Sequence, residues 1–374
     1  MDYASSALSS SANPSAIHEL GIQEKKKLDN ARKTVAGILG AHTDEIIFTS
    51  GATESNNLAI LGLVQNFKNP HIVTTNIEHA SVLEVCKHLE KTKQAKVTYV
   101  AVEENGIVDP KKIKKALKLN TVLVSVMYAN NEIGTIQPIR EVAKEIRHYK
   151  KTRNSNLEPR TYPVFHTDAT QAVNYLPIQV AKLGVDLLSF NAAKIYGPKD
   201  VGVLYKKRNV QLSPIMHGGN QEFGLRPGTE NIAGAMALAL ALLTTEKVKE
   251  KEVKRLTALR NYFIHSLIRA NKRIVLNGDE KARLPNNVNI TIPKIPSDLL
   301  VIELSARDIM ASAKSACKAG DGKASHVIEA INKNIKETDG SLRFSLGRFT
   351  KKKDIDYTVK TLSEILTKLK KWYD

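Results

Sequence analysis

The sequence is organised around the segment Ser189-Phe-Asn-Ala-Ala-Lys194-Ile-Tyr-Gly-Pro-Lys-Asp-Val-Gly-Val-Leu-Tyr205. Two short apolar runs, 185–190 and 201–205, are typical of strands, and Gly197-Pro198 indicates a turn between them. Lys194 therefore falls at the mouth of a sheet, where a lysine can be partly desolvated and its amine can form a Schiff base. A lone lysine at a strand end is more often simply solvated, so its interpretation depends on the rest of the chain.

Short apolar segments alternate with helical patterns along the first two thirds of the chain. Such alternation predicts a parallel sheet with helices on both faces, and hence an α/β fold. The expected helices are 17–39, a helix opening at 52, a helix after 81, 110–117 and 139–149, and a polar, basic surface loop is expected between 150 and 160. The expected strands are 45–49, 71–75, 97–100, 121–127, 162–166, 185–190 and 201–205.

The remaining third of the chain predicts a second, smaller unit. An Ala-rich apolar helix, 232–243, is expected to be buried, and a long charged helix from about 244 to 270 leads away from it. We place the domain boundary along that charged helix, because 374 residues suggest two domains. The expected elements beyond it are strands at 287–291 and 342–346 and helices at 297–305, 325–334 and 355–373.

The composition is that of a globular protein with a strong positive charge. Hydrophobic residues make up 42% and charged residues 25%, and 56 Lys and Arg against 38 Asp and Glu give a net charge of +18. Such a charge raises the idea of a nucleic-acid partner. Direct nucleic-acid binding is nevertheless not expected, because the lysine runs at 25–27, 111–115 and 351–353 read as solvated helix faces without interleaved aromatic residues.

The cysteine content indicates a reducing compartment. Only Cys86 and Cys317 occur, which excludes a disulfide framework and a CxxC zinc pair, and no metal site is expected. Cys86 has the helical spacing of a core residue. The N-terminus lacks a secretory signal pattern, and no apolar run approaches the roughly 20 residues that span a bilayer. We therefore expect a soluble, cytoplasmic protein without membrane contact.

Polar residues follow several of the expected strands. Ala52 and Thr53 open a helix directly after a strand, which suits an anion, although an ordinary capped helix explains them equally well. His79 falls where a strand gives way to a helix, a position common for ligand contacts and also for hydrogen-bonded structural histidines. Asn130-Asn131-Glu132 and Asp168-Ala-Thr-Gln171 follow two further strands, so a ligand crevice is expected at this edge of the sheet.

Two polar segments are candidate functional loops. Residues 217–231 form a Gly-rich stretch with Arg226 and Thr229 that is too long for a plain connection. Residues 311–325 are mostly small and polar and are expected to form a mobile surface loop. Lysines at 314 and 318 favour a reactive thiolate at Cys317, although an incidental cysteine fits the same position.

Read together, the motifs resemble those of the pyridoxal-phosphate-dependent cysteine desulfurases of the class V aminotransferase group. The resemblance is closest to the housekeeping branch, which supplies sulfur for iron–sulfur clusters and tRNA thiolation. The segments that carry it are Asn13-Pro-Ser-Ala-Ile-His18, Phe48-Thr-Ser-Gly-Ala-Thr-Glu-Ser55, Glu78-His79, Asn130-Asn-Glu-Ile-Gly134, Asp168-Ala-Thr-Gln171, Lys194-Ile-Tyr-Gly-Pro-Lys199, Arg226-Pro-Gly-Thr229, Ser315-Ala-Cys317 and Arg343-Phe-Ser-Leu-Gly-Arg348.

The resemblance implies a fold, an assembly and a reaction. The fold is the aspartate-aminotransferase-like fold type I, with a large domain (14–250) around a mostly parallel seven-stranded sheet. A smaller α/β domain consists of 1–13 and 251–374 and carries the Cys317 loop. The assembly is a homodimer, and the reaction converts L-cysteine to L-alanine with a persulfide on Cys317. A sulfur-acceptor protein, either an iron–sulfur scaffold or a tRNA-thiolation enzyme, is the implied partner.

The resemblance also implies residue roles. Lys194 holds pyridoxal 5′-phosphate as a Schiff base and later moves the substrate's α-proton, and Asp168 pairs with the ring nitrogen. His79 is an expected catalytic residue that stacks on the ring and shuttles protons. The remaining expected contacts are Gln171 and Asn131 at the ring oxygen, with Asn131 also near substrate, Ala52, Thr53, Asn191 and the neighbouring subunit's Thr229 at the phosphate, and Arg343 at the substrate carboxylate.

One departure and two alternatives accompany the resemblance. The family has Ser-Gly-His before its lysine, whereas this chain has Asn191-Ala192-Ala193, so one phosphate donor is missing and weaker cofactor binding is expected. Lys314 stands where glycine is usual. The nearest alternative function is a selenocysteine lyase or a related β-eliminating lyase. A cofactor-poor sulfur-relay or RNA-binding protein is the second, suggested by the missing histidine and the charge.

Overall fold

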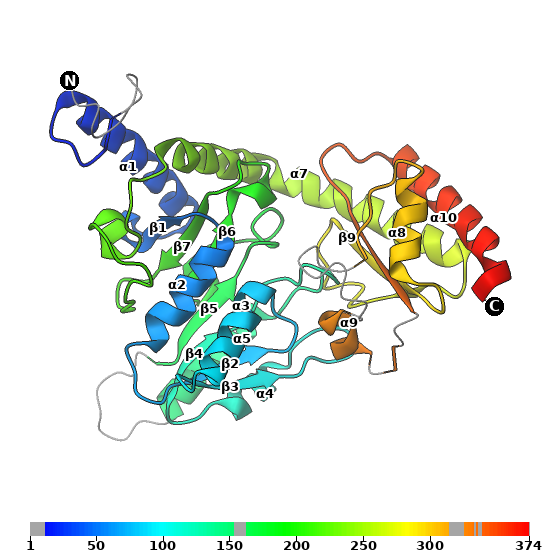
Figure 1. Cartoon of the computed structure of the whole chain (residues 1–374), viewed down its shortest axis with the longest axis horizontal. Coiled ribbons are helices and arrows are strands. Elements are labelled where there is room, and N and C mark those ends of the chain that lie inside the picture. The colour runs from blue at the N-terminus through cyan, green and yellow to red at the C-terminus, as the bar shows by residue number, and fades with distance from the viewer. Residues whose placement is uncertain (1–11, 153–161, 314–324, 333, 336–338, 374) are drawn as a thin grey trace.

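The computed structural model describes residues 12–152, 162–313, 325–332, 334–335 and 339–373, and within them the chain forms two β-sheets (Figure 1). The larger sheet has seven strands in the order β1-β7-β6-β5-β4-β2-β3. Its strands are β1 Ile46–Thr49, β2 His71–Thr75, β3 Lys96–Val100, β4 Thr121–Ser125, β5 Val164–Asp168, β6 Leu187–Asn191 and β7 Gly202–Lys206.

Parallel pairing dominates this sheet, as the alternation of strands and helices predicts. The pairs β2–β3, β2–β4, β4–β5 and β5–β6 are parallel, and only β7 runs antiparallel to its neighbours β6 and β1. All seven strands expected in the first two thirds of the chain are present, with ends that shift by no more than about two residues. The α/β fold class is therefore confirmed.

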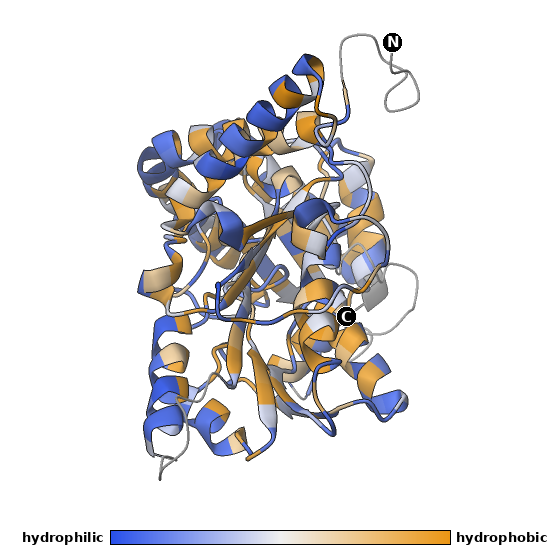
Figure 2. Ribbon diagram, turned by 90° about the vertical axis from the view of Figure 1, so that its left-hand side faces the viewer, coloured by the Kyte–Doolittle hydropathy of each residue, from blue (hydrophilic) through white to orange (hydrophobic). Residues whose placement is uncertain are grey.

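Helices cover both faces of the large sheet. Consecutive strand residues alternate between two buried clusters, so that Phe165 and Leu188 belong to one cluster and their neighbours Val164 and Leu187 to the other. Hydrophobic residues line the central strands, and hydrophilic residues gather on the outer faces of the helices (Figure 2). The helices of this part are α1 Glu19–Leu39, α2 Ala52–Val64, α3 Ala80–Lys91, α4 Pro110–Ala116, α5 Ile139–Thr152 and α6 Val180–Leu183.

Helix α7 (Ile232–Ala270) differs from the prediction in two respects. The apolar and the charged segments form one continuous helix that runs from the large sheet to the small one (Figure 1). The apolar segment was also expected to be buried, but Met236 is 44%, Leu240 65% and Leu243 38% exposed. This part of the helix has apolar residues on all of its sides, but only one side can pack on the rest of its own chain. The apolar side chains on the other sides are therefore exposed.

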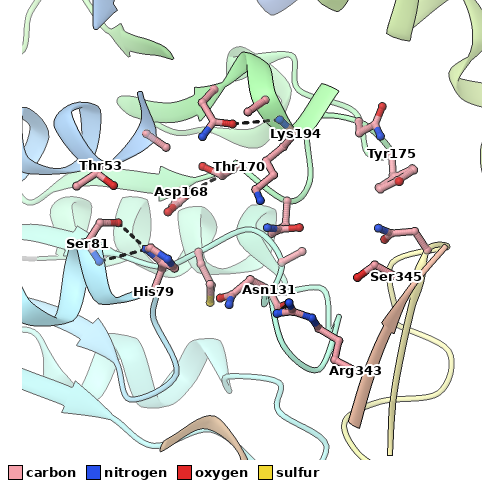
Figure 3. Close-up of a pocket in the computed structure, with 18 of the residues that line it drawn as sticks. Thr53, His79, Ser81, Asn131, Asp168, Thr170, Tyr175, Lys194, Arg343 and Ser345 are labelled. Carbon is pink, nitrogen blue, oxygen red and sulfur yellow. Dashed lines mark hydrogen bonds between the residues drawn. The ribbon is translucent and has the colours of Figure 1, made fainter. Parts of the chain in front are cut away.

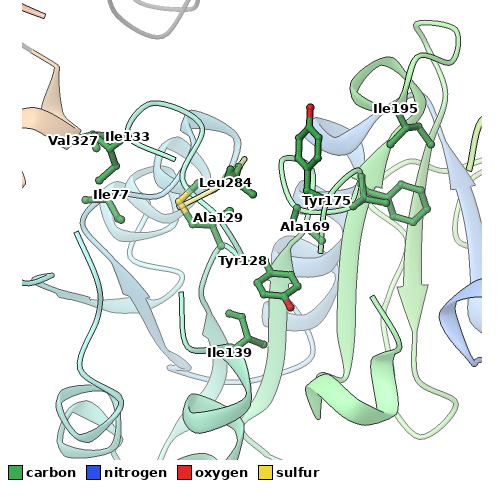
Figure 4. Packing of buried hydrophobic residues seen from close by; sticks show 14 of the residues in the cluster. Ile77, Tyr128, Ala129, Ile133, Ile139, Ala169, Tyr175, Ile195, Leu284 and Val327 are labelled. Carbon is green, nitrogen blue, oxygen red and sulfur yellow. The ribbon is translucent and has the colours of Figure 1, made fainter. Parts of the chain in front are cut away.

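The second sheet has three antiparallel strands in the order β10-β9-β8. Its strands are β8 Val275–Leu276, β9 Asn287–Ile292 and β10 Gly340–Ser345, and helices α8 Ser297–Ser305, α9 His326–Ile331 and α10 Lys352–Tyr373 accompany them. Leu284, which lies between β8 and β9, and Val327, in α9, share one buried cluster with Ala129 and Ala169 beside the large sheet (Figure 4). The two sheets therefore meet through a common apolar contact. No helix in the described part of the chain is long and apolar enough to cross a membrane.

Candidate active site

A cavity of about 380 Å³ lies between the carboxyl ends of the large sheet's strands and strand β10 of the small sheet (Figure 3). That volume is in the range of small-molecule sites. Both sheets contribute to its wall, as expected for a crevice at this edge of an α/β sheet. The residues predicted from the sequence that line it are Ala52, Thr53, His79, Asn131, Asp168, Gln171, Asn191, Lys194 and Arg343.

The start of α2 forms one end of the cavity. Gly51 caps the helix, and the first-turn residues Ala52 and Thr53 contribute to the cavity wall. Backbone N–H groups in a first helical turn have no partner within the helix and attract an anion. Strand β7 packs closely on this turn, because a Cβ placed on Gly202 would lie 2.6 Å from the Gly51 backbone. A side chain at 202 would therefore displace the anion-binding end.

Asp168, the last residue of β5, lies in the middle of the cavity wall. Its carboxylate accepts a hydrogen bond from Asn56 Nδ2 at 2.8 Å and another from the Thr170 backbone N–H at 2.9 Å. The residue is only 5% exposed, so both donors act in a largely water-free setting. These two donors fix the position of the Asp168 carboxyl group in the wall.

Lys194 faces the same cavity from a short 3-10 turn, Ala192–Ile195. The Asn191 side chain caps this turn by accepting a hydrogen bond from the Lys194 backbone N–H at 3.3 Å. The Lys194 side chain extends into the cavity toward the side where Asp168 lies (Figure 3). Tyr196, in the left-handed region at φ 64°, ends the turn, and its hydroxyl accepts a hydrogen bond from the Arg348 N–H at 3.0 Å. This hydrogen bond connects the turn that carries Lys194 to Arg348, which follows β10 of the small sheet.

Arg343 brings a cation into the cavity from β10. Its Nη1 donates to the Asn131 carbonyl at 3.0 Å, whereas its buried Nε has no hydrogen-bond partner in the described part of the chain. Burial lowers the pKa of the guanidinium, and the nearby Glu132 opposes that shift. A buried donor without a partner is costly, so this side of the cavity is arranged to receive an anionic ligand.

Glu78, next to His79, is a buried carboxyl beneath the cavity. It accepts hydrogen bonds from the Thr75 hydroxyl at 2.6 Å and the Met127 backbone N–H at 3.0 Å. Burial nevertheless raises the pKa of Glu78 to about 8, and the negative charge of Asp168 adds to the shift. Glu78 therefore retains its proton at a pH at which an exposed glutamate has lost it.

One predicted site residue lies away from this wall, and another falls outside the described part of the chain. Thr229 is exposed and is not among the residues that line its own chain's cavity. Cys317 and Lys314 lie outside the described residues. The sequence analysis also missed contributors to the site, namely Asn56, Ser81, Tyr175, Tyr196, Asn286 and Ser345. Tyr196 and Ser345 stand within the quoted motifs and could have been found there, whereas Asn286 carries no signal of its own.

Comparisons with known proteins agree with this geometry. Residues 3–358 match the family described as aminotransferase class-V. A protein named cysteine desulfurase IscS from Dictyoglomus turgidum is 43% identical over 360 residues, which cover 96% of this chain and 88% of that protein. A solved structure titled NifS-like protein superposes with a TM-score of 0.86 at 34% identity, covering 96% of this chain and 92% of the other. Another, titled SspA in complex with cysteine, gives a TM-score of 0.73 at 31% identity, covering 90% and 91%.

The buried Glu78 predicts a pH dependence of stability. Its native pKa of about 8 lies above the ordinary value of 4.5, so the native state retains a proton that the unfolded state loses between these values. Stability should therefore fall as the pH rises from about 4.5 to about 8, by on the order of 1.4 kcal/mol per pH unit, and then level off. Glu78→Gln should abolish this component in urea unfolding at several pH values. Glu84→Gln, at the surface of the neighbouring helix α3, should retain it, and identical slopes for both variants would contradict the assignment.

Proposed function

This chain belongs to the class-V aminotransferase family, and we propose that its cavity holds pyridoxal phosphate covalently on Lys194. The protein is a pyridoxal-phosphate-dependent cysteine desulfurase. The observation that best supports the proposed residue roles is that Lys194, Asp168 and Arg343, which come from three separate segments, face one cavity. The two alternatives, a selenocysteine lyase and a cofactor-poor sulfur-relay or RNA-binding protein, are not favoured.

The residues around the cavity fit the cofactor's chemical groups. The first turn of α2, with Ala52 and Thr53, suits the phosphate, and the hydrogen-bonded Asp168 side chain suits a protonated pyridine nitrogen. Gln171 and Asn131 line the wall where the ring oxygen is expected. When bound, the cofactor acts as an electron sink for bonds at the substrate's α-carbon. Lys194, once free, accepts the α-proton and returns a proton to the product.

Arg343 is proposed to orient the substrate. Its Nε, which has no partner among the described residues, and its Nη2 can donate together to the carboxylate of L-cysteine, while Nη1 stays on the Asn131 carbonyl. Such a pair fixes the amino acid at its carboxyl end. Asn131, held by the same contact, lines the cavity beside the expected substrate position. The amino acid's side chain is then directed away from Arg343.

Cys317 is proposed to collect the substrate sulfur. Residues on both sides of its segment are held at the cavity. Ser312 exchanges two backbone hydrogen bonds with Arg343, at 2.8 and 3.1 Å, and the Ser325 hydroxyl donates to the buried Glu132 carboxylate. Cys317 itself lies outside the described residues, four positions along the chain from Ala313.

The proposed transfer conserves atoms and electrons. The Cys317 thiolate forms an S–S bond with the substrate's sulfur while the substrate's C–S bond breaks, and the carbon retains that bond's electron pair. Protonation of the carbon releases L-alanine, and Cys317 is left as a persulfide. A protein that accepts this sulfur, for iron–sulfur cluster assembly or tRNA thiolation, is the proposed partner. We propose the cytoplasm as the compartment, because a persulfide carrier needs reduced thiols.

A homodimer is the proposed assembly. The exposed apolar side chains of α7, Met236, Leu240 and Leu243, recur at helical spacing and lie on the helix that also packs against α1. Exposed apolar patches of this kind mark interaction surfaces. Thr229, exposed on its own chain, would then reach the neighbouring chain's phosphate site. We also retain the proposed division into a large domain, 14–250, and a small domain of 1–13 and 251–374.

Replacing the proposed sulfur acceptor tests the function directly. Cys317→Ser should reduce sulfur release from L-cysteine to background, because serine cannot form a persulfide, while the visible absorption of bound cofactor stays unchanged. Cys86→Ala is the matched control and should retain activity, because burial raises the pKa of the Cys86 thiol to about 12 and keeps it inert. Sulfide release by Cys317→Ser at the parent rate would refute the assignment of Cys317.

The missing histidine before Lys194 predicts a change in cofactor affinity. Ala193 lines the cavity beside the proposed phosphate end but has no hydrogen-bond donor. Ala193→His should strengthen cofactor binding by about 1–3 kcal/mol, the contribution of a hydrogen bond to a charged group. Fluorescence titration of the cofactor-free protein with pyridoxal phosphate measures the difference, with Ala193→Leu as a size control. Equal affinity of the parent and Ala193→His would contradict the prediction.

The apolar face of α7 predicts the oligomeric state. Leu240→Asp should convert a particle of two chains into one of a single chain, because a carboxylate at a 65% exposed apolar position would be buried on pairing. Sedimentation equilibrium measures the mass. Leu119→Asp, a 77% exposed leucine away from α7, should leave the dimer intact. A single-chain particle for the parent protein would exclude the homodimer.

A further inference from the structure

The His79 side chain is held by donors on one of its two ring nitrogens. His79 caps the N-terminus of α3, and its Nδ1 lies 3.1 Å from the backbone nitrogen of Ser81. A backbone N–H can only donate, so Nδ1 must present a lone pair. A neutral ring in this position therefore carries its proton on Nε2.

The Ser81 hydroxyl also donates to His79 Nδ1. Asp168 fixes the orientation of this hydroxyl through Asn56. Asn56 Nδ2 lies 2.8 Å from Asp168 Oδ2 and 2.8 Å from Ser81 Oγ. The reverse orientation of the Asn56 amide would place its oxygen against a carboxylate oxygen, so the NH₂ group faces both acceptors. Ser81 Oγ, which accepts from Asn56, then has its own proton free for His79 Nδ1 at 2.8 Å. Figure 3 shows both contacts between Ser81 and the His79 ring.

His166, in the same protein, is a histidine whose contacts do not fix its tautomer. Its Nδ1 lies 2.8 Å from Ser125 Oγ and its Nε2 3.0 Å from Ser189 Oγ. Each hydroxyl can donate or accept, so these contacts permit either tautomer. His79 differs because a backbone N–H and an oriented hydroxyl both point at a single nitrogen.

We propose that Asn56 and Ser81 hold His79 as a hydrogen-bond donor to the cavity through Nε2–H, and not as a base. A ring whose Nδ1 receives two donors and whose Nε2 already carries a proton has no site for a proton from substrate. Proton acceptance in the cavity then falls to Lys194. Asn56 and Ser81 are positioning residues in this proposal, which rests on the proposed function only in placing substrate and cofactor in the cavity.

The tautomer can be measured without any turnover. The protein is labelled with ¹⁵N-histidine and examined by long-range ¹H–¹⁵N correlation NMR near pH 8, where histidines are normally neutral. The chain has ten histidines, and the signals that disappear in His79→Gln assign residue 79. The expected result is a pyridine-type Nδ1 and a pyrrole-type Nε2. Ser125→Ala, which alters the His166 pair, should leave these signals in place, and a pyrrole-type Nδ1 would overturn the proposal.

Two substitutions separate donor from base by kinetics. Glutamine and asparagine both remove the imidazole stack, but only His79→Gln places an amide N–H near the position of Nε2. His79→Gln should therefore retain a kcat at least about tenfold above that of His79→Asn, whereas loss of a general base costs roughly 10²–10⁴-fold in either variant. Equal losses would overturn the donor role. A parent protein that forms no alanine from cysteine would instead refute the proposed function and leave the NMR result standing.

Discussion

The cavity depends on the segment Asn130-Asn131-Glu132. Hydrogen bonds of this segment join the large sheet to the small one. The Asn130 side chain accepts from the backbone N–H groups of Glu132 and Ile133 and donates to the Ile77 carbonyl, which fixes the segment on the large sheet. Its other side contacts β9, β10 and the start of α9. Asn287 and Asn289 donate to the Glu132 carbonyl, Arg343 to the Asn131 carbonyl and Ser325 to the Glu132 carboxylate. Loss of this segment's geometry would separate the two walls of the site.

The charged groups of the cavity are positioned by the secondary-structure elements that carry them. Asp168 is fixed at a strand end because an amide and a backbone N–H donate to it, whereas burial raises the pKa of Glu78, behind the wall. Arg343 lies on the opposite sheet, and its Nε has no hydrogen-bond partner among the described residues. The result is a cavity with an anion-binding helix start, a fixed carboxylate, an amine and a guanidinium. Each belongs to a different element, so the fold and not local sequence sets their spacing.

The sequence predicts strand positions well because burial on both faces produces short, continuous apolar runs. It also predicts most of the cavity wall, since polar residues that follow parallel strands must meet at one edge. It fails where a role depends on contact between distant segments. Asn56 and Asp168 are 112 positions apart, and nothing in the local pattern of α2 indicates that its buried amide meets a strand end. The exposed side of α7 was missed for a related reason, because an apolar helix reads the same whether its own chain or another molecule covers it.

The segment before Lys194 contains one position that supports the turn and one position that would contact a ligand. In the family that the sequence resembles, a serine and a histidine at this site both contact phosphate. Here Asn191 preserves what the turn itself needs, since its side-chain oxygen accepts the Lys194 N–H as a serine cap would. Ala193 supports neither the turn nor a ligand. A chain can therefore keep the lysine turn, its left-handed Tyr196 and its link to Arg348 while losing a phosphate donor. Asn191 thus meets a requirement of the turn, whereas Ala193 lacks a donor that the proposed cofactor would use.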